Sequence, residues 1–290
     1  MFADFLQFDF LRYTLYTGIL IGIIAPLLGT FLVVRRLSLL ADALSHVTLA
    51  GIAFGLLLEK QFLSFTLSPI YSGMGFSVIG AMLIEKLRSV YKSYEEIGIP
   101  IILSGGVGLS VIFISLANGF NTDLFNYLFG SVSAVSKMDL ITIAIIFVIV
   151  IVTIFIFYKE LLTLSFDEEH ATVSGIHSKI IHFIFIVLTA LVIAASIRIV
   201  GILLVSALMT IPVATAMRFA VSFKQLIVYS IIFAEASVII GLVSGYYIGI
   251  PPGGTIVIIS IFFLIFAIML NNLKAKFKIK TEEKESIHDE

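Results

Sequence analysis

Apolar stretches close to the length of a membrane span recur along almost the whole chain. A helix needs about 20 mostly apolar residues to cross the hydrocarbon core of a bilayer. Hydrophobic residues make up 60% of the sequence and charged residues 13%, about half the charged fraction of a soluble domain. The sequence therefore predicts an all-α, polytopic helical membrane protein with nine spans, or eight if residues 197–199 are a break inside one bent element. The expected spans are residues 13–34, 39–58, 64–84, 98–118, 138–158, 180–197, 199–217, 225–248 and 252–271.

The basic residues predict how these spans are oriented, because Lys and Arg collect in cytoplasmic loops. With nine spans and an outside N-terminus, all but four of the 18 Lys and Arg residues fall on the cytoplasmic side. The exceptions are Arg12, Lys60, Lys137 and Arg198. We therefore expect a multi-pass cell-membrane protein with its N-terminus outside and its C-terminus in the cytoplasm. Residues 1–273 would form the transmembrane domain, and the charged residues 274–290 a solvated cytoplasmic tail.

Several kinds of chemistry are excluded by what the sequence lacks. There is no cysteine, which rules out disulfides, thiolate metal sites and cysteine nucleophiles. No GxxxxGK[ST] loop is present, so the chain does not hydrolyse ATP by that route. The polar interruptions are too short for an independent domain, and the first ten residues lack the basic start of a cleaved signal. Any energy for transport would therefore come from an ion gradient or a partner subunit.

Asp42 and His46 form a polar pair inside the second apolar run. Their four-residue spacing places both side chains on one face of a helix, one turn apart. Ionisable groups at bilayer depth cost at least about 2.5 kcal/mol to insert, and they usually mark a path or a binding site. A carboxylate with a neutral imidazole suits zinc or manganese. In the alternative interpretation, Asp42 caps the helix or pairs with Arg35 or Arg36, while His46 bonds a neighbouring helix.

Glu235 is a second acidic residue deep inside an apolar run. It would complete a metal site with Asp42 and His46 if the second and eighth helices meet. The alternative is a lone carboxyl that is protonated at depth or bonded to a serine. Glu235 is therefore the third, weaker candidate for a metal ligand.

A cytoplasmic segment, residues 164–176, contains Glu169, Ala171 and Gly175 in E-x-A-x-x-x-G spacing. This spacing is similar to the coupling segment of ABC importers, in which a short helix inserts into a cleft of the ATPase and the glycine ends it. The alternative is an ordinary charged surface loop. His170 and His177 lie in the same stretch and are expected to be solvated rather than metal ligands.

Five motifs in order resemble the membrane permeases of zinc- and manganese-uptake ABC importers. The resemblance covers roughly residues 13–270, which makes a chance similarity between apolar helices improbable. The residues that carry it are 35–46, 123–130, 164–176, 200–208 with 211–216, and 252–257.

The resemblance implies a transport subunit rather than an enzyme, with no permanent cofactor or nucleic-acid partner, that pairs, usually with an identical copy, over two cytoplasmic ATPases. It also implies that an extracytoplasmic binding protein docks on outer loops, including residues 121–130, and hands over the metal. Asp42 and His46 would line the metal path, and Glu169, Ala171 and Gly175 would couple the permease to the ATPase. The position of Glu235 is less uniform among such permeases.

The transported metal is predicted to be zinc, with manganese as the alternative, because residues 123–130 and 251–257 look closer to the zinc-uptake branch. An Asp/His pair admits both ions, since affinity order alone does not set selectivity. The sequence lacks the signals of two other classes of membrane protein. An ion-coupled secondary transporter usually shows paired inverted repeats, which this sequence does not display. An intramembrane metalloprotease would want a motif such as H-E-x-x-H, which is absent.

Overall fold

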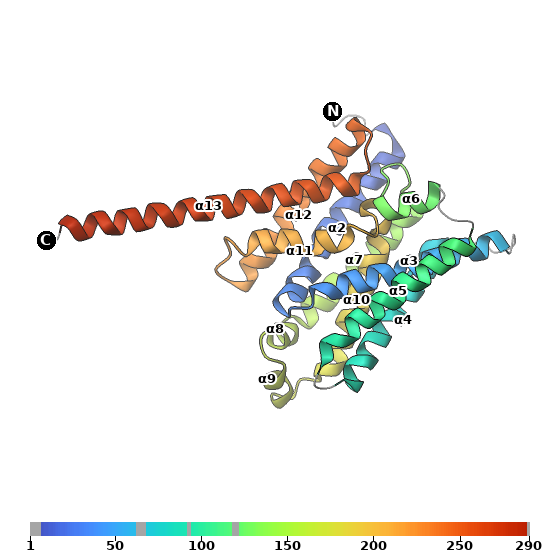
Figure 1. The fold of residues 1–290 in the computed structure, drawn as a ribbon, viewed down its shortest axis with the longest axis horizontal. Helices are drawn as coiled ribbons and strands as arrows, with labels where there is room; N and C mark the ends of the chain where they lie inside the picture. Colours follow the sequence, from blue (N-terminus) through green and yellow to red (C-terminus); the bar gives the residue numbers. More distant parts are fainter. Residues whose placement is uncertain (1–6, 62–67, 92–93, 118–121, 289–290) are drawn as a thin grey trace.

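The computed structural model describes residues 7–61, 68–91, 94–117 and 122–288, and within these ranges the regular structure is entirely helical (Figure 1). The first four residues of the third expected span lie outside them. The helices are α2 (Asp9–Val34), α3 (Ser38–Gln61), α4 (Pro69–Val90), η1 (Glu95–Ile97), α5 (Gly98–Leu116), α6 (Thr122–Phe129), α7 (Lys137–Ile156), α8 (Tyr158–Phe166), α9 (Glu168–Val173), α10 (Ser178–Val200), α11 (Val205–Ala216), α12 (Phe223–Ile248) and α13 (Pro252–His288).

Eight of the described helices are long and apolar enough to cross a membrane, and α11 is a shorter apolar helix. The eight-span prediction is thus matched by length and composition, and α11 occupies the place of the seventh expected span, residues 199–217. α11 packs its middle against α2, where a Cβ on Gly29 would overlap the carbonyl oxygen of Met209. Residues just beyond its end, Met217 and Ala220, line a cavity with Val33 of α2.

The interruption between α10 and α11 lies at residues 201–204, so the expected break at 197–199 is wrong. Arg198 stays helical because its side chain reaches polar partners at the end of α10. It donates to the carbonyl oxygen of Ala134 at 3.0 Å and to the Asp139 carboxylate at 2.7 Å. Gly201 then ends the helix with a φ of 83°, a conformation in which glycine carries no Cβ penalty.

The centre of the bundle is formed by α2, α3 and α10, whose residues are mostly buried. In contrast, α5 and α7 expose large apolar side chains along much of their length, including Val111, Ile112, Ile145 and Phe155. Apolar side chains gain nothing from water but are compatible with lipid tails. The exposed apolar faces therefore fit a bundle surrounded by bilayer.

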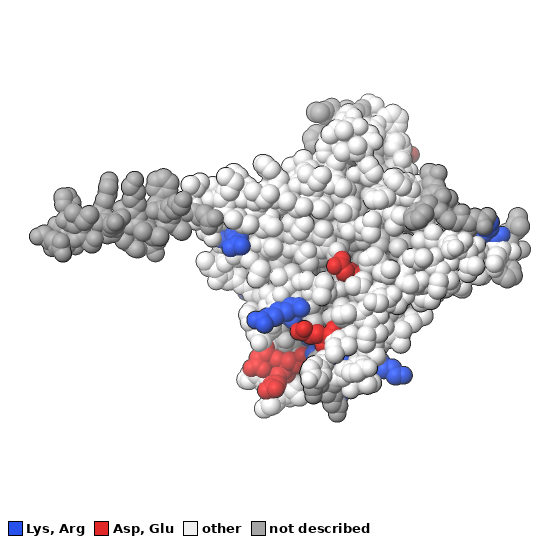
Figure 2. Space-filling view, viewed as in Figure 1, with Lys and Arg blue, Asp and Glu red and all other residues white. Residues whose placement is uncertain are grey.

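The bundle has two ends, each named after the short helix that it carries. At the α9 end, Glu168 of α9 reaches Arg35 after α2 and Arg88 of α4. Figure 2 shows charged side chains gathered at the end that carries α8 and α9, next to a mostly uncharged middle of the bundle. Charge at the ends and an apolar middle are typical of a membrane-spanning protein.

At the α6 end, glycines allow the backbones of distant segments to touch. A Cβ at Gly130 would overlap the carbonyl oxygen of Ile199, and one at Gly253 would overlap that of Val200. Backbone hydrogen bonds join the same segments, with the N–H of Ile202 donating to Tyr127 at 2.9 Å. The end of α6, the α10–α11 turn and the start of α13 are therefore locked together.

The last helix, α13, continues far beyond its apolar part. Its apolar span covers Pro252–Asn271, but the helix extends to His288. Residues 274–288, expected as a solvated tail, are thus helical, and in Figure 1 this end projects away from the bundle.

Candidate functional site

Asp42 and His46 lie in the first three turns of α3, near its start at Ser38. The helix is continuous from Ser38 to Gln61, so the two residues share one face as their spacing predicts. Both side chains are half-buried. α5 crosses α3 at this level, because a Cβ on Gly106 would lie within 3.1 Å of backbone atoms of His46 and Val47. An acid and an imidazole thus lie one turn apart where α3 and α5 cross.

Within the part of the chain that the structure describes, no three or more His, Asp or Glu side chains are grouped so as to hold a metal. Asp42 and His46 therefore form at most a two-ligand site in one chain. Glu235 does not complete a third position. It lies on α12 against α2, where a Cβ on Gly22 would overlap its carboxylate, and its buried Oε1 has no hydrogen-bond partner among the described residues.

The α9 segment, residues 167–176, is a short helix that is capped at both ends. The Asp167 side chain accepts a hydrogen bond from the N–H of His170 at 2.8 Å and so caps the start. At the end, the N–H of Ile176 donates to Ala171 and that of Gly175 donates to Thr172, both at 3.1 Å. This pair of bonds is a Schellman motif, with Gly175 at φ 84° in its left-handed position.

The three residues singled out by spacing have distinct places in this segment. Ala171 is completely buried against the bundle, while Glu169 is exposed. Gly175 has open space around it, so its backbone conformation and not a close approach requires glycine there. The exposed surface of α9 also includes Val173, which is 87% exposed. A short rigid helix with an outward-facing acid and an apolar side chain is suited to docking in a partner's cleft. His170 and His177 are exposed, as expected.

Sequence reasoning missed an ionic cluster that surrounds the α9 segment. Glu168 Oε2 accepts a hydrogen bond from Arg88 Nη2 at 2.7 Å and lies 3.9 Å from Arg35 Nη2. His182 of α10 is buried, with its Nε2 3.3 Å from Glu85 Oε2 of α4. These residues stand at the ends of apolar runs, and that position is the signal that could have drawn attention to them.

A second missed cluster lies at the α6 end, around Arg198. Besides Ala134 and Asp139, the guanidinium donates to the Tyr127 hydroxyl at 3.3 Å and lies 5.8 Å from the centre of that ring. The cluster joins α6, α7 and α10. In the sequence, Arg198 stood out as one of the few basic residues expected on the outer side.

These features define a class: a multi-pass helical membrane protein, with a polar pair in a central helix and a small capped helix at one end. Comparison with known proteins makes the assignment specific. Residues 7–271 match the ABC 3 transport family, and the chain belongs to this family.

Three similar proteins illustrate the range of the family. The manganese import system permease protein ScaB of Streptococcus gordonii is 34% identical, over 97% of this chain and 100% of its own length. The high-affinity zinc uptake system membrane protein ZnuB of Haemophilus influenzae is 34% identical, over 90% of this chain and 98% of its own. The solved structure of PsaBC from Streptococcus pneumoniae in complex with Fab superposes with a TM-score of 0.78 at 31% identity, covering 92% of this chain and 95% of that one.

Proposed function

We propose that this chain is the membrane-spanning subunit of an ATP-driven importer of a divalent metal, with zinc as the first candidate and manganese as the second. The observation that carries the proposal is the Asp42–His46 pair, half-buried near the start of the central helix α3. Imidazole nitrogen favours zinc, and carboxylate oxygen admits manganese as well. The names of two relatives, one a zinc uptake protein and one a manganese import permease, support the same two ions.

The path runs along the α3 face that carries Asp42 and His46, in a cavity between two copies of the chain. Two protein ligands hold an ion more weakly than a tetrahedral structural site does, which suits a site that must release its cargo. Glu235 stays a secondary candidate for the path, because its carboxylate packs against α2.

The partners follow from the same assignment. An extracytoplasmic binding protein delivers the metal at the α6 end, and a cytoplasmic ATPase docks on the α9 segment, in which Glu169 is exposed, Ala171 anchors the helix to the bundle and Gly175 ends it. ATP-driven closure of the two ATPases then switches the path from outward-facing to inward-facing. This places the N-terminus outside and the C-terminus in the cytoplasm.

The orientation is testable by labelling, because the chain contains no cysteine. Single cysteines replace Val173 on α9 and Ser133 at the α6 end, both of them exposed. In intact cells a membrane-impermeant thiol reagent should label Ser133→Cys and spare Val173→Cys. The reverse pattern would contradict the orientation.

The function is tested by metal content in cells that lack the gene. Cells complemented with the wild type should accumulate zinc, or manganese if that is the cargo. Asp42→Asn and His46→Gln should each lower uptake by about tenfold or more, because losing even an outer-shell partner of a metal site lowers affinity 10–100-fold.

Glu59→Gln is the matched control, since it removes an exposed carboxylate from the other end of the same helix. Membrane levels of all variants are measured by immunoblot. Normal uptake by both Asp42→Asn and His46→Gln would remove the pair from the path. No difference in either metal between wild-type and empty-vector cells would overturn the metal assignment.

A further inference from the structure

The Glu168 side chain forms ion pairs that connect α9 to the rest of the bundle. It precedes Glu169 on the same short helix, but its side chain points inward and is 43% exposed. Its carboxylate meets Arg88, 18% exposed, and Arg35, 5% exposed. Ion pairs shielded from water are screened less and hold their geometry better than those on an open surface. The contact therefore joins α9 to the bundle more firmly than an exposed ion pair would.

Arg35 belongs to the tight turn that leads directly into α3. It caps α2, and the N–H of Leu37 then donates to Leu32 at 2.8 Å while that of Arg36 donates to Val33 at 3.0 Å. These bonds form a second Schellman motif, with Arg36 in the left-handed position at φ 59°. α3 begins at Ser38. Arg35 and the start of α3 are thus separated by a turn too short to bend independently.

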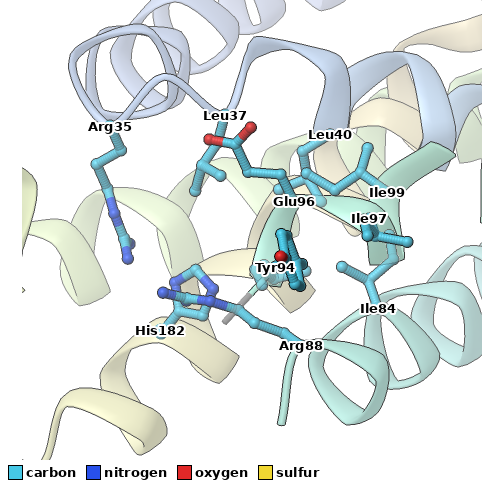
Figure 3. Close-up of a pocket in the computed structure, with 11 residues that line it drawn as sticks. Arg35, Leu37, Leu40, Ile84, Arg88, Tyr94, Glu96, Ile97, Ile99 and His182 are labelled. Atoms are coloured by element: carbon cyan, nitrogen blue, oxygen red, sulfur yellow. The ribbon is translucent and has the colours of Figure 1, made fainter. Parts of the chain in front are cut away.

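A cavity of about 500 Å³ lies beside this junction. Figure 3 shows Arg35, Arg88 and His182 on one side of it, and Ile84, Ile97 and Ile99 on the other. The carboxylate of Glu168 already faces Arg88 and Arg35, and Glu96 also lines the cavity. The charges around the cavity are therefore largely balanced, which argues against a site for a free anion. The space instead leaves the α2–α3 turn room to shift.

We infer that Glu168, with Arg88 and Arg35, is the positioning link that carries movement of α9 to the start of α3 and hence to Asp42 and His46. This inference rests on the proposed function. The exposed residues of α9 contact the ATPase, and Glu168 transmits the movement of α9 to the rest of the permease. A connection through partly buried ion pairs favours movement of the two elements together, because separating the charges costs more where water screens them less.

The first experiment uses the full complex of permease, ATPase and binding protein in proteoliposomes. Metal uptake and ATP hydrolysis are measured together for the wild type, Glu168→Gln, Arg88→Gln and the control Lys86→Gln, an exposed lysine of α4. Glu168→Gln and Arg88→Gln should lower the number of ions moved per ATP by about tenfold, within the range of coupling mutations. Lys86→Gln should leave the ratio unchanged. The amount of ATPase that copurifies should be the same in all four.

Rescue variants distinguish the loss of this link from a general loss of protein stability. Glu168→Asp keeps the charge and should retain most of the ratio. The exchange Glu168→Arg with Arg88→Glu should restore it above either single change. A wild-type ratio in Glu168→Gln would overturn the inference. So would a loss of copurifying ATPase in that variant, because Glu168 would then belong to the docking surface.

A second readout does not depend on which substrate is moved. Spin labels at Leu39→Cys, at the exposed start of α3, and Ser174→Cys, at the end of α9, report the distance between the two elements. In the wild-type background this distance should stay the same with and without trapped ATP. In Glu168→Gln it should broaden or change. If it changes equally in both backgrounds, the link does not exist, whatever the permease transports.

Discussion

The two ends of the bundle are held together in different ways. At the α6 end, Gly130, Gly201 and Gly253 bring backbones into direct contact, and the surrounding turns exchange main-chain hydrogen bonds. At the α9 end, long charged side chains meet beside a cavity of about 500 Å³.

The two ends therefore differ in how easily their elements can shift. Backbone contacts without room for a methyl group have no alternative packing, since protein interiors are close-packed and resist small changes in volume. Ion pairs beside a cavity can move together with the elements that they join, because the neighbouring space admits a shift of both. The α6 end is therefore expected to hold its shape, and the α9 end to change during transport. α3 runs between the two, with Asp42 and His46 near its adjustable end.

The largest expected effect on stability comes from adding a methyl group at the tightly packed α6 end. Gly253→Ala would push a methyl group into the carbonyl oxygen of Val200, a backbone atom that cannot turn aside. Overpacking of this kind costs about 3 kcal/mol or more of folding free energy. Size-exclusion chromatography of the detergent-extracted protein should show loss of most of the folded peak.

The neighbouring residue supplies the control. A Cβ on Gly254 would meet nothing within 4 Å, so Gly254→Ala should change stability by less than about 0.5 kcal/mol. Equal behaviour of the two variants would show that the α6 end is as adjustable as the other.

Arg198→Gln should have the next largest effect. It removes the hydrogen bonds to Asp139 and Ala134 that join α10 to α7 and its preceding loop. Hydrogen bonds that involve a charged group contribute about 1.5–3 kcal/mol, so the thermal unfolding midpoint should fall clearly. Lys137→Gln, an exposed basic residue at the start of α7, should leave the midpoint in place. An unchanged midpoint in Arg198→Gln would mean that the glycine contacts hold this end without the cluster.

Gly175→Ala should act locally at the other end. The left-handed conformation at φ 84° costs a residue with a Cβ about 1–2 kcal/mol. Hydrogen exchange should speed up over residues 168–176 while the rest of the protein keeps its protection. A drop in protection throughout the bundle would contradict a locally adjustable α9 end.

Arg36→Gly should give the smallest change, and in the opposite direction. Arg36 adopts the left-handed conformation at φ 59° without being glycine. Relief of this strain is partly offset by the greater freedom of glycine in the unfolded chain, which leaves a gain of about 0.5 kcal/mol. A lower unfolding midpoint would show that the Arg36 side chain stabilises the turn.

The fold could be predicted largely from the sequence because a bilayer permits few arrangements. Runs of about 20 apolar residues have to be helices when no water is present to satisfy the backbone. The expected break at 197–199 was wrong because Arg198 finds partners more than 50 residues away in the chain, and a linear pattern does not reveal them. Close backbone contacts at Gly130 and Gly253 were invisible for the same reason.

The candidate site, too, could be predicted from the sequence only in part. Spacing alone placed Asp42 and His46 on one helix face and matched the short helix that ends at Gly175, because both patterns depend on neighbours in the sequence. The link from Glu168 to Arg88 joins residues 80 positions apart. Only the folded arrangement of the bundle brings α4 and the α9 segment within reach of each other, so no local pattern could have shown it.

The most direct measurement is uptake of radioactive zinc and manganese by the reconstituted complex, with ATP enclosed and the Asp42→Asn variant run in parallel. If the path along α3 is correct, the wild type accumulates at least one of the two ions in an ATP-dependent manner, and Asp42→Asn hydrolyses ATP but accumulates that ion about tenfold less. Equal accumulation by the wild type and Asp42→Asn would contradict the path. Active ATP hydrolysis by the wild type without uptake of either ion would contradict the metal assignment itself.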